Sequence, residues 1–237
     1  MTETVNPGFS RRKIFPSAFK YSIPVLLGYA AIGVAFGLLL SGTGYPWWLA
    51  FVMSLWMYAG AGQFIAVGLF AAGTTLWEAC LVQLIVNARH IAYGLSMLNR
   101  FKDLGSFKPY LVFSLTDETF ALLSSLPEEK FSKEEKRLFM FYVALLDQCY
   151  WVSGSVLGAA AGALLPFDMK GIGFALTALF VVLMIEQIKM VRKPGIFIIS
   201  AAAALAGVFL FPGKLSLLAA LAIALFISPF AMRRKKV

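Results

Sequence analysis

The chain has 237 residues, of which 60% are hydrophobic and only 14% are charged. Soluble domains contain about 45–50% apolar and about 25% charged residues, so this composition excludes an ordinary soluble enzyme. Lysine and arginine number 21 against 12 acidic residues, which gives a formal net charge of +9. The basic residues gather where apolar segments end. That pattern favours the positive-inside bias of a membrane protein over nucleic-acid binding, and it predicts anionic lipid headgroups as partners.

Eight apolar segments follow one another through short connections, near residues 22–40, 47–71, 75–98, 107–126, 138–165, 171–188, 195–211 and 215–231. Each is predicted to be a helix, because an open sheet cannot satisfy its backbone hydrogen bonds in lipid. We expect an all-α, multi-pass integral membrane protein with six to eight full crossings. Residues 22–232 would form one transmembrane helical domain, between a basic N-terminus (1–21) and a basic tail (233–237).

Both termini are predicted to be cytoplasmic, because residues 11–20 and 233–236 are rich in lysine and arginine. The loop at 99–108 fits eight crossings badly, since it carries three basic residues and one acid but would face outward. If 47–71 and 107–126 were re-entrant, this loop would be cytoplasmic and six full crossings would remain. The sequence leaves both topologies open.

The same two segments have the most disruptive interiors, Gly60-Ala61-Gly62-Gln63 in the first and Thr116-Asp117-Glu118 in the second. Both are predicted to be broken helices. Broken helices expose backbone N–H and C=O groups at mid-membrane, where transporters bind their substrates. Gly60, Gly62, Gln63 and Thr116 are therefore candidate site residues.

An ionisable side chain inside a membrane helix costs about 2.5–3.5 kcal/mol on insertion scales, so each one needs a reason. Helical spacing places Asn87 and His90 on one stripe with Gln83, and Arg89 on another face. Arg89 would meet a substrate carboxylate or pair with a structural acid. Asn87 would line a hydrated path or hold helices together. His90 would shuttle protons or be a satisfied interior histidine.

Asp117 is the acid to which we assign the most weight. In a continuous helix it would share a small, polar face with Tyr110, Ser114, Ala121 and Ser124, while Glu118 would point about 100° away. Such a face suits a ligand ammonium or a coupling proton. The alternative is an ion pair with Arg89 that sets the helix register.

Asp147 lies on a helix face with Trp151, Gly154 and Gly158, and Gly162 continues the small-residue spacing. Small residues four apart let helix backbones approach closely, so this acid is expected to face protein. Gly33 and Gly37 repeat that spacing nearer the N-terminus. If Asp147 lies near the cytoplasmic end instead, a solvated or arginine-paired carboxylate is the simpler explanation.

Several chemistries have no motif in this sequence. There is no nucleotide-binding G-x-x-x-x-G-K-[ST] loop, no H-E-x-x-H and no G-x-S-x-G, so we expect neither an enzyme nor a cofactor. One histidine and two isolated cysteines make a metal site improbable.

The polar residues instead suit a carrier for a small zwitterion. Arg89 or N–H groups freed at Gly60–Gly62 would bind the carboxylate, and Asp117 would bind the ammonium. Two other classes stay open: a cation/proton exchanger or channel subunit that relays through Asp117, Asp147 and His90, and a non-transporting assembly subunit.

Four ordered runs also carry a family resemblance: YAGAGQF at 58–64, NARH at 87–90 with YGLS at 93–96, LTDETF at 115–120, and FALTALF at 174–180. Together they resemble the AzlC family, the large subunits of bacterial branched-chain amino acid exporters, over about residues 15–232. The resemblance implies a bacterial cytoplasmic (inner) membrane protein that exports leucine, isoleucine, valine or analogues. It also implies energy from the proton gradient and a small hydrophobic AzlD-like partner. It assigns no mechanistic role to single residues.

Overall fold

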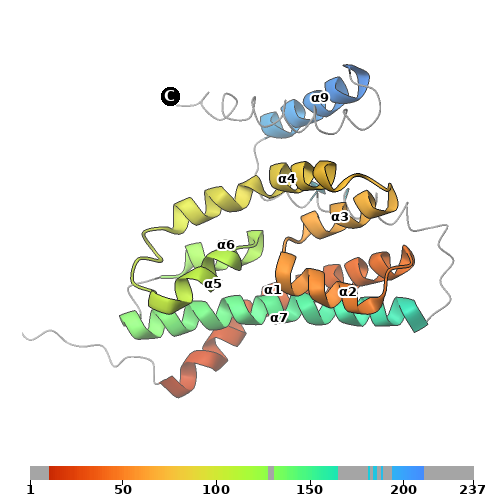
Figure 1. Ribbon diagram of the computed structural model, residues 1–237. Helices are drawn as coiled ribbons and strands as arrows, with labels where there is room; N and C mark the ends of the chain where they lie inside the picture. Colours follow the sequence, from red (N-terminus) through yellow and green to blue (C-terminus); the bar gives the residue numbers. More distant parts are fainter. Residues whose placement is uncertain are drawn as a thin grey trace, which may run out of the picture. The chain divides into compact units, whose positions relative to one another are not determined.

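The computed structural model describes residues 11–127, 131–164 and 194–210, together with the single residues 181, 184, 185 and 188. All the secondary structure in these ranges is helical, as predicted (Figure 1). The elements are α1 (Arg11–Gly42), α2 (Trp47–Val52), the π-helix η1 (Met53–Met57), α3 (Ala61–Ala71), α4 (Leu76–Met97), the 3₁₀-helix η2 (Gly105–Phe107), α5 (Lys108–Phe113), α6 (Asp117–Ser125), α7 (Lys133–Leu164) and α9 (Pro194–Leu210). The expected segment 215–231, and all but four residues of 171–188, lie outside the described residues.

The chain divides into two compact units. Within the described ranges, unit 1 comprises residues 11–73, 87–127 and 131–164, and unit 2 comprises 74–86 and 194–210. In unit 2, α4 starts with a capping box: the Thr75 N–H donates to Glu78 Oε2 at 2.9 Å and the Glu78 N–H donates to Thr75 Oγ1 at 3.4 Å. Helix α9 agrees with the apolar segment expected at 195–211.

Helices α1 and α7 form the framework of unit 1 and run parallel. Contacts between them advance together along both chains, from Tyr21 with Phe139 (ring centroids 5.6 Å apart) to Tyr29 with Trp151 (5.2 Å). Each helix has 32 residues and is therefore about 48 Å long. Helix α1 starts at Arg11, well before the expected boundary at residue 22, and its residues 13–42 are long and apolar enough to cross a membrane.

Small residues let these two helices touch backbone to backbone. The sequence predicted close packing at these residues but not which helices would meet. A Cβ added to Gly37 would lie 2.0 Å from the Ser155 carbonyl oxygen, and one added to Gly158 would lie 2.1 Å from that of Val34. Real Cβ atoms do not approach backbone oxygens so closely, so both positions require glycine.

The segment 47–71 is a broken helix that turns back on itself, and we call it the first hairpin. Helix α2 and η1 form the first arm, which ends at Met57. The chain then reverses at Tyr58 and Gly60, whose φ values are positive (40° and 47°), and α3 forms the second arm. The Tyr45 ring, just before the hairpin, lies 5.6 Å from the Phe70 ring near its far end. The two ends of the first hairpin therefore lie at the same end of unit 1, where α1 ends.

The second hairpin, residues 108–125, enters from the opposite end. Helices α5 and α6, of six and nine residues, are about 9 and 14 Å long and flank a break at Ser114–Thr116. Arg100 Nη1 donates to the Leu123 and Leu126 carbonyls, at 3.1 Å each, so the chain before the hairpin lies beside the end of α6. Neither arm could cross a hydrocarbon core about 30 Å thick.

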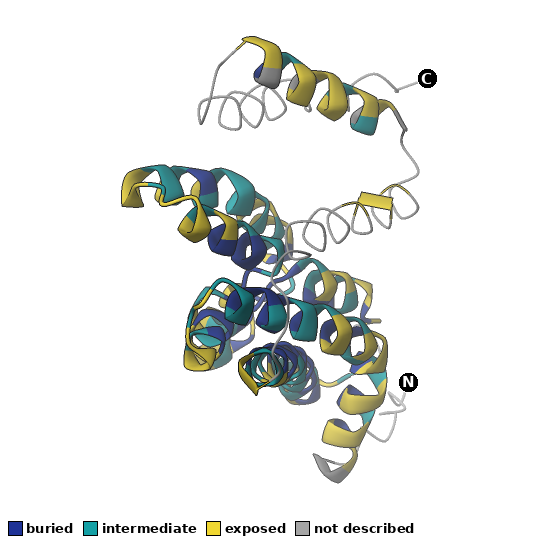
Figure 2. Ribbon diagram, turned by 90° about the vertical axis from the view of Figure 1, so that its right-hand side faces the viewer, coloured by how far each residue is buried: buried dark blue, intermediate teal, exposed yellow. Residues whose placement is uncertain are grey.

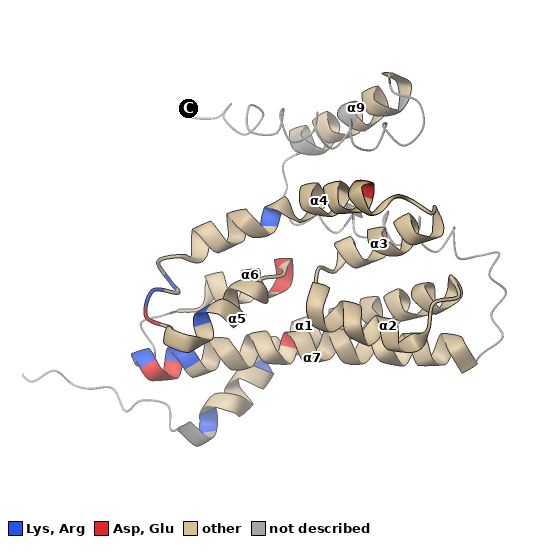
Figure 3. Cartoon of the chain, in the orientation of Figure 1, with Lys and Arg blue, Asp and Glu red and all other residues tan. Residues whose placement is uncertain are grey.

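The loop at 99–108 lies beside the start of α7. Asp103 Oδ2 is 3.6 Å from Lys133 Nζ, and the Arg137 guanidinium lies 4.8 Å from the centre of the Phe107 ring. An apolar core joins this end of α1, α4 and α7; it includes Ile14, Ala18, Met97, Phe101, Leu104, Phe139 and Met140. Figure 3 shows charged residues of unit 1 gathered at this end, where α7 begins.

The two hairpins meet inside unit 1, where the Tyr58 ring centroid lies 6.3 Å from that of Phe113. Figure 2 shows exposed residues along the outer faces of the helices of unit 1. Many exposed side chains are large and apolar, among them Leu27, Trp56, Ile91, Leu95 and Leu157, each more than half exposed. Apolar side chains on the outside of a helical unit, with the backbone hydrogen bonds satisfied inside the helices, suit a lipid environment.

Candidate functional site

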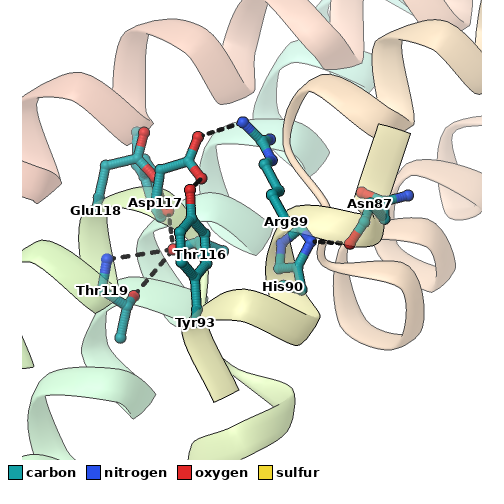
Figure 4. Close-up of polar contacts among 9 residues, drawn as sticks. Asn87, Arg89, His90, Tyr93, Thr116, Asp117, Glu118 and Thr119 are labelled. Atoms are coloured by element: carbon teal, nitrogen blue, oxygen red, sulfur yellow. Dashed lines mark hydrogen bonds and ion pairs between the residues drawn. The ribbon is translucent and has the colours of Figure 1, made fainter. Parts of the chain in front are cut away.

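An ion pair joins α4 to the start of α6, at the break in the second hairpin (Figure 4). Arg89 Nη1 lies 2.6 Å from Asp117 Oδ2, and the Tyr93 hydroxyl donates to Asp117 Oδ1 at 2.7 Å. The Arg89 and Asp117 side chains are 35% and 24% exposed, so the pair is neither sealed in the core nor freely solvated. The ion pair that the sequence offered as an alternative for Asp117 is thus present.

Arg89 retains donors that the protein does not use. Its Nε is buried and has no hydrogen-bond partner among the described residues. A guanidinium carries five N–H donors in a planar fork that matches a carboxylate in a two-point contact. A buried donor without a partner costs about 1–3 kcal/mol, so a ligand carboxylate bound here would remove that cost.

The helical structure of the second hairpin is interrupted before Asp117, where the Thr116 side chain caps the start of α6. Thr116 Oγ1 accepts from the Thr119 N–H at 3.3 Å, and Asp117 and Glu118 follow in the first turn, where acids are favoured. The shared face of Asp117 with Tyr110 and Ser114 was expected only for a continuous helix, and the predicted break removes that condition. The Tyr110 hydroxyl instead donates to Gln148 Oε1 at 2.8 Å.

Glu118 points away from Asp117, as expected, and interacts with a different helix. Its Oε2 accepts from the Tyr29 hydroxyl of α1 at 2.8 Å. Tyr29 is buried, whereas Glu118 is exposed. The two acids therefore serve two separate sets of contacts.

Asp147 lies midway along α7 and is wholly buried. Its Oδ2 accepts from the Thr119 hydroxyl at 2.9 Å, and its Oδ1 has no hydrogen-bond partner in the described part of the chain. It faces protein, as the small-residue pattern predicted. The alternative of a solvated carboxylate near the helix end does not hold, since α7 starts at Lys133, well before the expected residue 138.

Gln63 is a structural connection between the first hairpin and α7. Its Oε1 accepts from Trp151 Nε1 at 2.8 Å and from the Ala59 N–H at 3.3 Å, and its Nε2 donates to Ser54 at 3.3 Å. The Gly62 N–H, expected to be freed for a ligand, donates to the Ala59 carbonyl at 2.9 Å. The turn at Gly60 is therefore partly closed on itself.

Asn87 and His90 lie on α4 close to Arg89 (Figure 4). His90 Nδ1 lies 3.0 Å from the Asn87 carbonyl oxygen, one turn earlier in the same helix. The His90 ring centroid is 5.9 Å from that of Tyr93. His90 thus borders the ion pair without joining it.

Sequence reasoning missed Tyr29, Tyr93 and Thr119 as members of the site. Each is a hydroxyl inside an apolar segment, and such hydroxyls need a partner when buried. That requirement was the available signal, but it does not identify the partner. Within the described ranges, no cluster of histidine, cysteine and acidic residues could hold a metal ion.

Comparison with known proteins identifies the family of this chain. A family profile described as AzlC protein matches residues 24–165. A Bacillus subtilis protein named branched-chain amino acid transport protein AzlC is 36% identical over 175 residues, covering 73% of this chain and 67% of that protein. The chain belongs to the AzlC family.

Other relatives of this AzlC family member are named as membrane proteins. A Helicobacter pylori uncharacterized membrane protein is 46% identical over 178 residues, covering 75% of this chain and 77% of its own. The Escherichia coli inner membrane protein YgaZ is 33% identical over 215 residues, which cover 86% of this chain and 85% of YgaZ. No solved structure matches the chain.

The match to the AzlC family confirms the resemblance found in the sequence. The matched range starts inside α1 and ends at the close of α7, and it contains both hairpins, the Arg89–Asp117 pair and Asp147. The family connects the chain with membrane transport.

Proposed function

We propose that this chain is the large subunit of an inner-membrane exporter of branched-chain amino acids that uses the proton gradient and works with a small hydrophobic AzlD-like subunit. The observation that carries the proposal is the partly exposed Arg89–Asp117 pair, in which the buried Arg89 Nε has no hydrogen-bond partner among the described residues. The Bacillus relative's printed name supports the substrate class. It supplies neither the direction of transport nor the partner.

A zwitterion can engage both charges of this pair at once. The ligand carboxylate would bind the unused donors of Arg89, and its ammonium would lie between Asp117 and the exposed Glu118. Two-point recognition of this kind fixes the α-carbon and leaves the side chain to be selected by apolar contacts. Gly60, Gly62, Thr116, Asn87 and His90 remain candidates for lining the path.

Efflux from reconstituted vesicles tests the proposal. Vesicles that contain the full-length chain, with or without the small subunit, would be loaded with labelled leucine or valine. We expect efflux only with both subunits, and faster efflux when a pH gradient is imposed. Labelled glutamate is the control, since apolar contacts would not select its side-chain carboxylate. Absence of efflux from the complete complex would reject the export function, and cation-driven proton movement instead would favour the exchanger.

We also propose that α1 and α7 start at the cytoplasmic face and that both hairpins are re-entrant. Support comes from the loop at 99–108, which packs against the start of α7, and from the basic residues gathered there. The N-terminus would then be cytoplasmic. The C-terminal tail, expected on the same side, lies outside the described residues.

Single cysteines measure this topology. After replacement of the exposed Cys80 and Cys149, Ser106→Cys should react only from the cytoplasm and Ala72→Cys only from outside. Thr43→Cys, before the first hairpin, should label from the same side as Ala72→Cys. Opposite labelling of Thr43→Cys and Ala72→Cys would mean that the first hairpin crosses the membrane.

A further inference from the structure

A continuous line of oxygen atoms connects Glu118 to Asp147 through three hydroxyl groups. Glu118 Oε2 lies 2.8 Å from the Tyr29 hydroxyl, which lies 2.6 Å from Thr116 Oγ1. Thr116 Oγ1 lies 3.1 Å from Thr119 Oγ1, which lies 2.9 Å from Asp147 Oδ2. The line runs from an exposed carboxyl group to a wholly buried one and joins α1, α6 and α7.

If both carboxyl groups were ionised, the line would contain too few protons for all of its hydrogen bonds to form. Its four oxygen–oxygen contacts each need one proton, but the three hydroxyls supply only three. If Tyr29 donates to Glu118 and Thr116 donates to Thr119, no proton remains for the 2.6 Å contact between Tyr29 and Thr116. Any other choice of donor directions for the three hydroxyls leaves a different contact without a proton. A single additional proton completes all four.

Burial supports the same conclusion independently. Among the described residues, neither Glu118 nor Asp147 forms an ion pair, and Asp147 also has an oxygen without a partner. A buried carboxylate without an ion pair is costly, so this cost falls on the wholly buried Asp147, and protonation of that group removes it. The surrounding titratable or charged groups that interact electrostatically with the line are Asp117, Arg89 and Tyr93 beside Glu118, and Tyr58, Tyr110 and Tyr150 beside Asp147.

We propose that Glu118 and Asp147 share one proton through Tyr29, Thr116 and Thr119. With the proton on Glu118, the donors run Glu118 to Tyr29 to Thr116 to Thr119 to Asp147. Reversal moves one proton across each contact: Glu118 becomes the carboxylate, Asp147 becomes the neutral acid, and every hydroxyl is restored. The net charge of the line stays at one negative charge throughout.

This arrangement would couple the proton to the substrate. A substrate ammonium at Glu118 favours the ionised form of that carboxyl group and so drives the proton to Asp147. Conversely, a proton on Asp147 strengthens the binding of the ammonium at Glu118. This consequence rests on the proposed export function. The shared proton itself does not.

Infrared spectroscopy of the full-length chain in lipid nanodiscs, without any amino acid present, tests the proposal. At neutral pH we expect the C=O stretch of a protonated carboxyl group. Glu118→Gln should abolish that band, because the amide N–H₂ supplies the missing proton and leaves Asp147 ionised. Asp147→Asn should abolish it in the same way from the other end. Asp103→Asn, on an exposed loop, is the matched control and should retain the band.

Tyr29→Phe separates a shared proton from one held by Asp147 alone. Tyr29 bonds Glu118 and Thr116, and its loss breaks the line, so the band should disappear. A band at wild-type intensity in Glu118→Gln or Tyr29→Phe would assign the proton to Asp147 alone and overturn the proposal. Absence of the band in the wild-type chain would also overturn it. Neither result depends on whether the chain exports amino acids, which the efflux assay decides.

Discussion

Leucine efflux by complexes carrying Arg89→Gln, Asp117→Asn or both changes is expected to fall at least about 30-fold. Removal of one partner of a hydrogen-bonded charge pair costs about 2–5 kcal/mol in binding, and the lower limit corresponds to that factor. Asp117→Asn preserves shape while it removes the charge that would attract a ligand ammonium. Arg89→Gln removes the two-point donor for the carboxylate.

Stability measurements on the same variants separate binding from folding. Each single change leaves one charge without its partner, so both singles should be less stable than the wild type in detergent. The double variant should regain stability but not efflux. The exposed Asp103–Lys133 pair is the matched control: Asp103→Asn with Lys133→Gln should change neither property, because surface pairs contribute about 0–1 kcal/mol. Near-normal efflux by the Arg89 and Asp117 double variant would reduce the pair to a structural role.

Gly37→Ala is expected to lower the thermal stability of the protein strongly, whereas Gly28→Ala in the same helix should not. A Cβ at Gly37 would lie 2.0 Å from the Ser155 carbonyl oxygen, which would force α1 and α7 apart. Overpacking typically costs about 1–3 kcal/mol, and a backbone atom cannot turn aside as a side chain can. At Gly28 no atom lies within 4 Å of the added Cβ, and alanine favours the helix.

Gly158→Ala provides the reciprocal check, since its Cβ would lie 2.1 Å from the Val34 carbonyl oxygen. The readout is the melting temperature of the purified protein in one detergent, together with its elution profile. Equal melting temperatures for Gly37→Ala and Gly28→Ala would show that the two helices do not touch as described.

The local sequence was sufficient to predict helices and the places where they break. Apolar segments embedded in lipid must be helical, because no water is present to bond their backbone groups. The residues at Gly60–Gly62 and Thr116–Glu118 disrupt a helix so strongly that the breaks are recognisable from the sequence. The small residues of α1 and α7 indicated close packing, because their spacing is a property of a single helix. The family was also recognisable from short motifs in the correct order.

Other features depend on contacts between distant parts of the chain, and periodicity alone could not supply them. The helix wheel placed Asp117 with Tyr110, but the break at Thr116 redirected Asp117 to Arg89 and Tyr93. The alignment of Thr116 and Thr119 with Tyr29 and Asp147 requires three helices to pack in one register. Composition and short motifs are therefore enough to predict a helical membrane protein of the AzlC family with costly polar residues inside. The tertiary structure decided which of those residues meet, because a buried polar group is satisfied by whichever partner the packing brings within hydrogen-bond distance.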